Sequence, residues 1–329
     1  MILMVAAVLG MLATAAVLMV RDWQQFRSAA LIDSGEIRLW IAPGMSFDAV
    51  ARQLETLGVG RRDWRWKLLG RLRQPRVQAG EYRIEPGLDV EGLLRKTATG
   101  DVLQHRFTIV EGWTVARLRR ALAGDPRLHP VAADLSDRQL MERLGCPDCP
   151  AEGQFLPETY FFVRGTTDLA LLAQAHTAMS TALEQVWKTR QADLPLDDPQ
   201  QLLVLASIIE RETGQHGERA RIAGVFVRRL KRGMRLQTDP TVIYGLGEAF
   251  DGRLRRVDLR RDHPWNTYTR HGLPPTPIAL PGRAALEAAA NPAPGSALYF
   301  VSRGDGSHHF SDTLAEHNAA VDRYIRGRP

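Results

Sequence analysis

Cysteine is scarce in this chain, because its 329 residues contain only two, both in the segment Cys146-Pro-Asp-Cys149. That count excludes a disulfide-rich secreted scaffold. A zinc site would need two further ligands, and no pair of histidines lies nearby in the sequence. A thioredoxin-like redox site follows a strand and opens a helix, whereas prolines flank and separate these cysteines. The pattern favours a small disulfide that closes a local loop.

Several motifs of large protein classes are missing as well. The chain has no P-loop, zinc-finger spacing or RNP-type aromatic motif, so its net charge of +6 favours anionic phospholipid or a polyanionic wall over nucleic acid. It has no GxSxG elbow, which argues against nucleophilic serine catalysis of that kind. It also lacks HExxH, and the adjacent His308 and His309 would point to opposite sides of a strand, so no metal site is expected.

Charge and proline are both absent from residues 1–20. About 20 apolar residues are enough for a helix to span the hydrocarbon core of a bilayer. The first charges follow at Arg21 and Asp22, and Trp23 is suited to the membrane interface. The alternative is a signal peptide cleaved near residues 13–15, but the apolar run continues beyond that site and no basic segment precedes it. We therefore predict an uncleaved, single-pass inner-membrane anchor with the soluble body facing outwards.

A small module is expected over residues 36–100, after a juxtamembrane linker at residues 21–35. Apolar periodicity and helix-start signals predict a strand, two helices, a returning strand and a further short helix, in that order. The two strands are expected at residues 36–42 and 80–84. This order resembles a LysM-like fold, which is associated with binding of N-acetylglucosamine polymers.

Residues 101–329 are expected to form one larger domain. It begins with a predicted strand at residues 104–110. Predicted helices follow at residues 114–122, 168–188, 199–213 and 219–232. The chain beyond residue 233 is rich in prolines and aromatic residues, which predicts loops up to a final helix at residues 313–324. The predicted fold class is therefore α+β: a transmembrane helix, a small LysM-like α+β module and a larger α+β domain.

Two acids stand at the end of a segment that otherwise reads as a fully buried helix. Asp198 and Pro199 are suited to its N-cap and first position, and Gly214 is suited to its stop. Glu210 and Glu212 lie in the last turn, where negative charge opposes the helix macrodipole. These acids are unfavourable for the helix, and no nearby residue in the sequence compensates for them. Such an unfavourable placement indicates function more often than packing.

The two acids are expected to differ in their surroundings. Glu210 lies over Leu203 and Ala206 on one helical face, and an apolar floor raises the pKa of a carboxyl, as suits a general acid. Glu212 points to roughly the opposite side, so the two do not form a pair across one scissile bond. The alternative is that both are solvated acids at a frayed helix end, and the segment by itself leaves the choice open.

Two later loops hold the residue types that bind sugars. Residues 237–245 supply amide, carboxylate and phenol groups, and residues 265–277 are polar, aromatic and stiffened by prolines. The candidate binding residues are Gln237, Asp239, Tyr244, Asn266 and Tyr268. Aromatic faces stack on sugar rings, and amides and acids form hydrogen bonds to their hydroxyls. For any single residue, an Asx turn or simple packing is the alternative.

These segments together are similar to the endolytic murein transglycosylase family, the YceG-like proteins. The matching motifs, in chain order, are Glu152-Gly, Pro157-Glu-Thr-Tyr160, Leu205-Ala-Ser-Ile-Ile-Glu210-Arg-Glu-Thr213, Arg235-Leu-Gln-Thr-Asp-Pro-Thr-Val-Ile-Tyr-Gly245, Asn266-Thr-Tyr268, Gly272-Leu-Pro-Pro-Thr-Pro-Ile278, Asn291-Pro292 and His317-Asn318. The resemblance covers the chain from about Arg21 and is strongest from Glu152 onwards. The two cysteines lie outside the family pattern, and only His308, not His309, matches its histidine.

The resemblance implies a lytic transglycosylase that cuts the β-1,4 bond between N-acetylmuramic acid and N-acetylglucosamine in nascent glycan strands and so ends their elongation. It assigns catalysis to Glu210 and substrate binding to Glu212, to the five loop residues above and to His308. One acid suffices, since the muramic acid 6-hydroxyl attacks the anomeric carbon and leaves a 1,6-anhydro end. No metal or cofactor is expected. The implied partners are peptidoglycan, the inner membrane and peptidoglycan synthases, with the catalytic domain in the periplasm.

Two other functions stay open at this point. A muramidase would hydrolyse the same bond with water and use Asp239 or Glu212 as its second acid. A non-catalytic wall-binding or divisome scaffold protein would rely on the LysM-like module and the basic surface instead.

Overall fold

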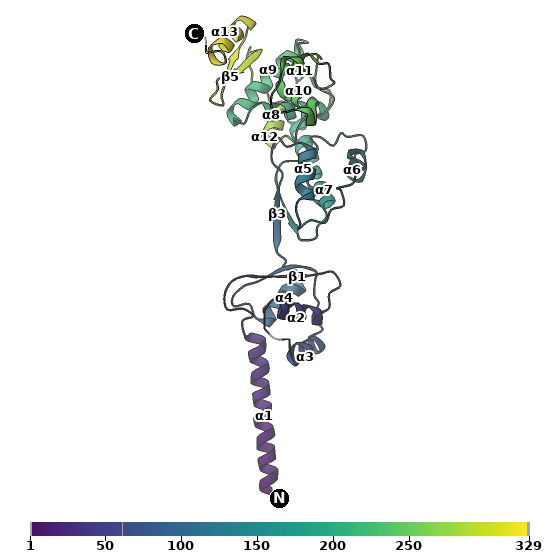
Figure 1. Ribbon diagram of the computed structural model, residues 1–329, viewed down its shortest axis with the longest axis vertical. Helices are drawn as coiled ribbons and strands as arrows, with labels where there is room; N and C mark the ends of the chain where they lie inside the picture. The colour runs from purple at the N-terminus through teal and green to yellow at the C-terminus, as the bar shows by residue number, and fades with distance from the viewer. Residues whose placement is uncertain (1, 61, 328–329) are drawn as a thin grey trace. The chain divides into compact units, whose positions relative to one another are not determined.

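The computed structural model describes residues 2–60 and 62–327, and for His216 the backbone only. The chain divides into two compact units, which are described separately (Figure 1). The first contains residues 1–105 and 161–165, and the second contains residues 106–160 and 166–329.

The first unit opens with the long apolar helix α1, Ile2–Ser28, which is long and apolar enough to cross a membrane. The helix continues past the apolar run, so residues 21–28 of the expected juxtamembrane linker are helical. Trp23 and Phe26, near its end, pack on the core of the first unit, and Arg27 forms a 2.6 Å ion pair with Glu91. These contacts stabilise the last turns of α1, which the apolar pattern alone could not predict.

The remainder of the first unit has the predicted order of elements. They are β1 (Ile37–Ile41), α2 (Phe47–Thr56), α3 (Trp64–Arg73), β2 (Gly80–Ile84) and α4 (Val90–Thr99). The strands pair antiparallel, with Leu39 opposite Tyr82. Ser46, Asp63 and Asp89 cap the three helices through their side-chain oxygens, as their positions before apolar periodic segments indicate. The likeness to LysM in particular stays a prediction.

The second unit is built around one apolar helix. Strands β3 (Gln104–Thr108) and β4 (Thr159–Val163) each have residues in both units. The other elements of the second unit are α5 (Val115–Ala123), α6 (Asp137–Arg143), α7 (Asp168–Lys188), α8 (Pro199–Glu212), α9 (Arg219–Lys231), α10 (Asp239–Leu246), α11 (Arg256–Arg260), α12 (Arg283–Ala290), β5 (Tyr299–Ser302), β6 (His308–Ser311) and α13 (Leu314–Tyr324), with short 3-10 turns at His216–Glu218 and Gly247–Ala249. Strand β3 pairs with β4, and β5 pairs antiparallel with β6. Helix α8 packs against α7, α9, α10 and α12.

The segment after residue 233 is rich in loops, as expected, but it also holds short elements that the sequence did not indicate. It contains α10, α11, α12 and the β5–β6 hairpin. Helix α10 starts with Asp239 and Pro240, and proline is tolerated in the first turn of a helix. Helix α12 is rich in alanine and largely buried. Helices this short give little periodic signal, and tertiary packing supplies most of their stability.

Candidate active site

Helix α8 carries both candidate acids at its C-terminal end. Asp198 caps its start by accepting the N–H of Gln201 at 2.8 Å, and Pro199 occupies the first turn, as predicted. Every residue from Leu202 to Ile209 is buried. The helix ends at Glu212 because Thr213 is extended, so the stop comes before Gly214. A rigid, fully packed helix therefore fixes the position of both carboxyl groups.

The side chain of Glu210 is largely shielded from solvent, and both of its carboxylate oxygens have polar partners. Its Oε1 lies 3.1 Å from Nη2 of Arg219, and its Oε2 accepts the N–H of Gly282 at 2.9 Å. Each of the two paired side chains is only 4 % exposed. A buried charge needs such partners, because an unpaired one costs several kcal/mol. The sequence could not reveal this pair, because Arg219 opens the next helix and reaches Glu210 only through helix packing.

Glycine at position 282 allows the backbone to approach the ion pair closely. A Cβ atom there would lie 1.9 Å from Oε1 of Glu111. The Glu111 carboxylate is in turn 3.5 Å from Arg219, so the guanidinium has an acid from α8 and a second one from the loop before α5. Glu210 is thus part of a network of charges and hydrogen bonds that connects four segments of the second unit: α8, α9 and the loops that hold Glu111 and Gly282.

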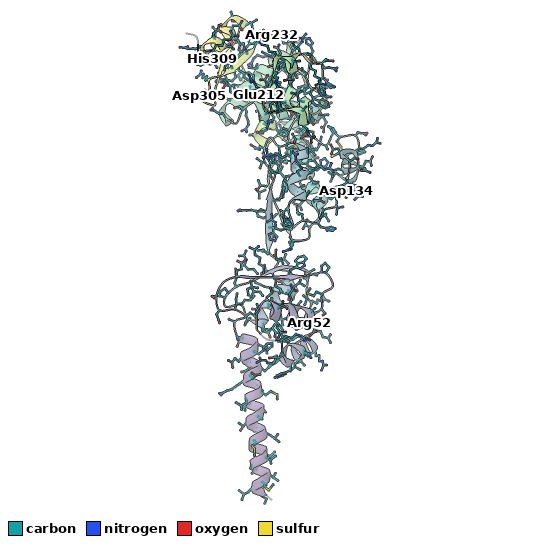
Figure 2. All side chains as sticks on the ribbon, viewed as in Figure 1. Arg52, Asp134, Glu212, Arg232, Asp305 and His309 are labelled. Carbon is teal, nitrogen blue, oxygen red and sulfur yellow. A yellow bond between two sulfur atoms is a disulfide. The ribbon has the colours of Figure 1, made fainter. Side chains whose placement is uncertain are left out.

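The surroundings of Glu212 raise the pKa of its carboxyl. Its Oε1 accepts a hydrogen bond from the hydroxyl of Thr238, at the start of α10. Burial raises the pKa of Glu212 to about 7, despite that hydrogen bond, and the Asp239 carboxylate raises it further. The positive charges of His308 and Arg229 act in the opposite direction. Figure 2 shows Glu212 in the helical part of the second unit. Its carboxyl is therefore able to give and take a proton near neutral pH.

Several predicted binding residues lie close to Glu212. The Tyr268 hydroxyl donates to Oδ1 of Asp239 at 2.6 Å, and the charges of Asp239 and Glu212 both act on that phenol. Burial first, and then Asp239, raise the pKa of Tyr268, so it stays a hydrogen-bond donor. Gln237 and Asp239 are exposed, and Gln237 adopts the left-handed conformation at φ 51°. The structure thus brings together one acid and polar side chains that face solvent.

His308 is oriented by a second acid. Its backbone N–H donates to Oε1 of Glu218 at 3.0 Å, and its Nδ1 lies 2.7 Å from Oε2 of the same carboxylate. His309, the next residue on β6, packs instead against the ring of Tyr324. The two histidines therefore point apart, as the strand pattern indicated, and only His308 is close enough to Glu212 for its charge to act there.

Tyr244 lies in a separate cavity of about 880 Å³. Its hydroxyl donates to Oε2 of Glu152 at 3.2 Å, and Oε1 of Glu152 accepts the N–H of Val115 at 3.0 Å. Burial raises the pKa of Glu152 to about 7. The cavity lining also includes Arg211 and Pro240, the sequence neighbours of Glu212 and Asp239, together with Trp113 and Trp265. This cavity therefore has aromatic walls and a protonatable carboxyl, that of Glu152.

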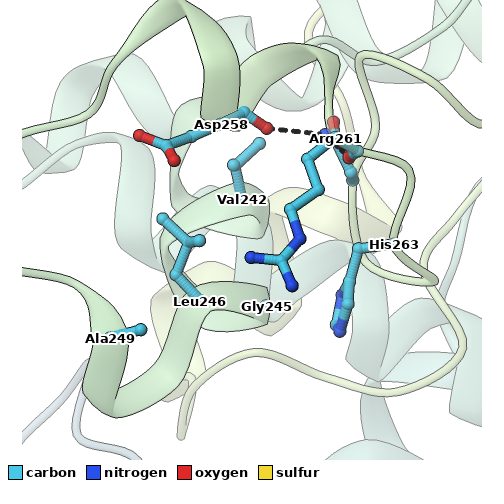
Figure 3. A pocket seen from close by; sticks show the side chains of 8 residues that line it. Val242, Gly245, Leu246, Ala249, Asp258, Arg261 and His263 are labelled. Atoms are coloured by element: carbon cyan, nitrogen blue, oxygen red, sulfur yellow. Dashed lines mark hydrogen bonds between the residues drawn. The ribbon is translucent and has the colours of Figure 1, made fainter.

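Asn266 supports a loop and does not face that cavity. Its Nδ2 donates to the carbonyl oxygens of Asp258, Leu259 and Arg261, and its Oδ1 accepts the N–H of Tyr268 at 2.9 Å. A smaller cavity of about 170 Å³ lies beside it, with Arg261 and His263 among its lining residues (Figure 3). Asn266 is buried, so the evident effect of its amide is to hold the loop that presents Tyr268.

The disulfide predicted for the cysteine pair is confirmed. Cys146 and Cys149 are bonded, and Cys149 lines a further cavity, of about 460 Å³, that shares Glu152, Tyr244 and Trp265 with the larger one. Within the described part of the chain, no cluster of three or more metal-ligating side chains occurs.

Two residues of the site were missed from the sequence. Thr238 lies inside the motif at residues 237–245, but its hydroxyl was not assigned to Glu212. Glu152 lies inside the motif with Gly153, but no role was given to its carboxyl. Each becomes recognisable only through a partner distant in sequence: Glu212 for Thr238, and Tyr244 for Glu152. The unexplained polar residues inside otherwise apolar segments were the available signal.

The fold and the site define a class of protein: an α+β protein with an N-terminal apolar helix, whose second unit presents a protonatable carboxyl from a rigid buried helix. The YceG-like family matches residues 39–323. The chain belongs to this family.

Individual relatives agree with the family match. An endolytic murein transglycosylase of Bacillus subtilis (strain 168) is 33% identical over 76% of this chain and 74% of its own length. One of Streptococcus pneumoniae serotype 2 is 27% identical over 77% of this chain, which spans 51% of that relative. The crystal structure of a YceG-like protein from Listeria monocytogenes superposes with a TM-score of 0.57 and 28% identity, covering 86% of this chain and 98% of the other.

Proposed function

We propose that this chain is a membrane-anchored endolytic murein transglycosylase, which cuts the β-1,4 bond between N-acetylmuramic acid and N-acetylglucosamine in nascent glycan strands. The observation that carries the proposal is the carboxyl of Glu212, which burial brings to a pKa of about 7 beside exposed polar residues. Membership of the family and the activity for which the relatives are named support it.

The reaction needs one group that acts first as acid and then as base. Glu212 donates its proton to the glycosidic oxygen while the bond from that oxygen to C1 of the muramic acid breaks. The resulting carboxylate then accepts the proton of the C6 hydroxyl as O6 forms a bond to C1. The product carries a 1,6-anhydro ring, no water is consumed, and Glu212 ends protonated as it began. The Thr238 hydroxyl stabilises the carboxylate between the two steps.

The proton donor in this proposal is Glu212, whereas the sequence resemblance assigns that role to Glu210. The ion pair with Arg219 and the hydrogen bond from Gly282 occupy both oxygens of Glu210, which supports a structural role. The Glu212 carboxyl accepts one hydrogen bond, from the Thr238 hydroxyl, and its pKa of about 7 suits a general acid. Catalysis by Glu210 stays the alternative, and the variants described in the Discussion separate the two.

Substrate binding is assigned to the side chains around the acid. Gln237, Asp239, Tyr268 and His308 would form hydrogen bonds to the sugars at the cleaved bond. Tyr244, with Trp113 and Trp265 in the cavity of about 880 Å³, would stack on sugar rings further along the strand. Asn266 would act indirectly, through the loop that carries Tyr268.

The anchor and location follow from helix α1. Helix α1 is long and apolar enough to cross a membrane, and Trp23, Phe26 and Arg27 join its last turns to the first unit. We place the protein in the bacterial inner membrane, single-pass, with the second unit in the periplasm. Peptidoglycan synthases are the expected partners, because a strand-ending enzyme acts where strands are made.

Product analysis tests the proposed reaction. The full chain is incubated with nascent, uncrosslinked glycan, and the cut ends are analysed by mass spectrometry. We expect muramic acid ends that are lighter by one water than hydrolysed ends. A muramidase that uses Asp239 as its second acid would give only the heavier product, and a non-catalytic scaffold would give no cut ends. Either of these results would contradict the proposal.

The rate of cleavage should fall as the pH rises past 7. With a pKa of about 7 for Glu212, the protonated fraction falls from about 90% at pH 6 to about 10% at pH 8. The Thr238 hydrogen bond lowers this pKa, so Thr238→Val should move the fall in rate to higher pH. Initial rates measured across this range for both proteins check the prediction. A rate independent of pH in the wild type, or an unmoved profile in the variant, would argue against Glu212.

A further inference from the structure

Helix α3 in the first unit is apolar on two opposite faces. Trp66 and Leu69 are buried in the core, at 4% and 1% exposure. On the other side Trp64, Leu68 and Leu72 are 50%, 36% and 66% exposed. These three residues are spaced four apart, so they form one continuous stripe along the helix. A helix needs only one apolar face to pack on its own core, so the exposed stripe is not needed for packing on that core.

The same helix is strongly basic and has no acidic residue. Its sequence, Trp64–Arg73, contains Arg65, Lys67, Arg71 and Arg73. At 100° per residue, Lys67 and Arg71 lie along one edge of the exposed stripe and Arg65 lies along the other. Such long basic side chains can keep an apolar stripe in contact with lipid while their charged ends stay with the headgroups. An apolar stripe with basic edges is the pattern of a helix that lies in a membrane interface.

Contacts with α1 bring this stripe to the level of the membrane surface. The rings of Trp23 and Trp64 are stacked with centroids 6.5 Å apart, and Arg65 forms a 3.0 Å ion pair with Asp22. Trp23 is three residues beyond the end of the apolar run at Val20, which is about 5 Å along a helix axis. The interfacial layer on each side of a bilayer is about 5–8 Å thick. Trp64 therefore lies within that layer when α1 spans the membrane, and Figure 1 shows α3 beside the end of α1.

We propose that α3 is an interfacial helix that binds anionic phospholipid, with Trp64, Leu68 and Leu72 inserted between the headgroups and Lys67 and Arg71 bound to lipid phosphates. The bilayer is the occupant that the observations favour, because the stripe is continuous with α1 and its charge is complementary to anionic headgroups. The first unit is then held on the membrane by two elements, the spanning helix and α3.

The test uses the full chain in lipid nanodiscs with a fluorescent environment-sensitive label on Leu72→Cys. The matched control is Leu314→Cys, a similarly exposed leucine of the second unit. The native cysteines are bonded to each other, so the label attaches to the introduced thiol. We expect a blue-shifted emission at position 72, strong quenching by lipids that carry a spin label near the headgroup, and neither effect at position 314.

Lipid charge is varied in the same experiment. Discs with anionic phosphatidylglycerol should give stronger quenching at position 72 than purely zwitterionic discs, and Lys67→Glu with Arg71→Glu should abolish that difference. Arg253→Glu with Arg256→Glu, an equal change of charge on exposed residues of the second unit, should leave it intact. Quenching at position 72 no greater than at 314 would overturn the proposal. Quenching independent of lipid charge would also overturn it. So would shielding of the label at position 72 that increases with protein concentration and not with lipid, because a second protein molecule would then cover the stripe.

Discussion

Replacing Glu212 with glutamine is expected to lower the rate of glycan cleavage by about 10²- to 10⁴-fold, the contribution of a positioned general acid–base group. The change keeps the shape of the side chain and an oxygen that accepts the Thr238 hydrogen bond. It removes only the proton that must be transferred. Glycan binding should therefore survive, and the loss should appear in kcat more than in KM.

Glu210→Gln is the matched control for this prediction. It makes the same chemical change two residues earlier on the same helix, and its amide oxygen can still accept the N–H of Gly282. We expect cleavage within about tenfold of the wild type, measured well below the melting temperature of each variant. If Glu210→Gln abolished cleavage in a folded protein while Glu212→Gln retained it, Glu210 would be the donor and our assignment would be wrong.

Replacing Arg219 with methionine is expected to destabilise the second unit by about 3–5 kcal/mol. The guanidinium and the Glu210 carboxylate are each 4% exposed, so the variant leaves a buried carboxylate with the Gly282 N–H and no cation from Arg219. Hydrogen exchange in α8 and α9, followed by mass spectrometry, measures the change in this unit separately from the first. Arg232→Met, at the exposed end of α9, should change protection by no more than about 0.5 kcal/mol.

A double variant distinguishes a missing charge partner from poor packing. Glu210→Met combined with Arg219→Met removes both charges, and such replacements of buried pairs are often neutral. Glu111, the other acid near Arg219, is 43% exposed and can be solvated by water. We therefore expect the double variant to recover most of the stability lost in Arg219→Met. Equal destabilisation in both variants would mean that packing around the guanidinium, and not the ion pair, holds this region together.

Short-range signals in the sequence predicted much of the fold. The apolar run of α1, the cap at Ser46, the helix starts near Asp63 and Asp89, and the apolar stretch of α8 all appear in the structure. These features depend on residues within one or two helical turns of each other. The short helices α10 and α12 were missed, because partners distant in sequence stabilise them and their own periodicity is weak.

The same division between short-range signals and partners distant in sequence applies to the site. The sequence by itself determined the segments to which we assign the chemistry: the two acids at the end of α8, the loop before Tyr268 and the residues around Asp239. Only the tertiary structure decided what surrounds each acid. It paired Glu210 with Arg219 across a helix junction and left Glu212 with a hydroxyl partner in a poorly hydrated position. Neighbours in space set the protonation of a carboxyl, and the chain order of two glutamates does not reveal them.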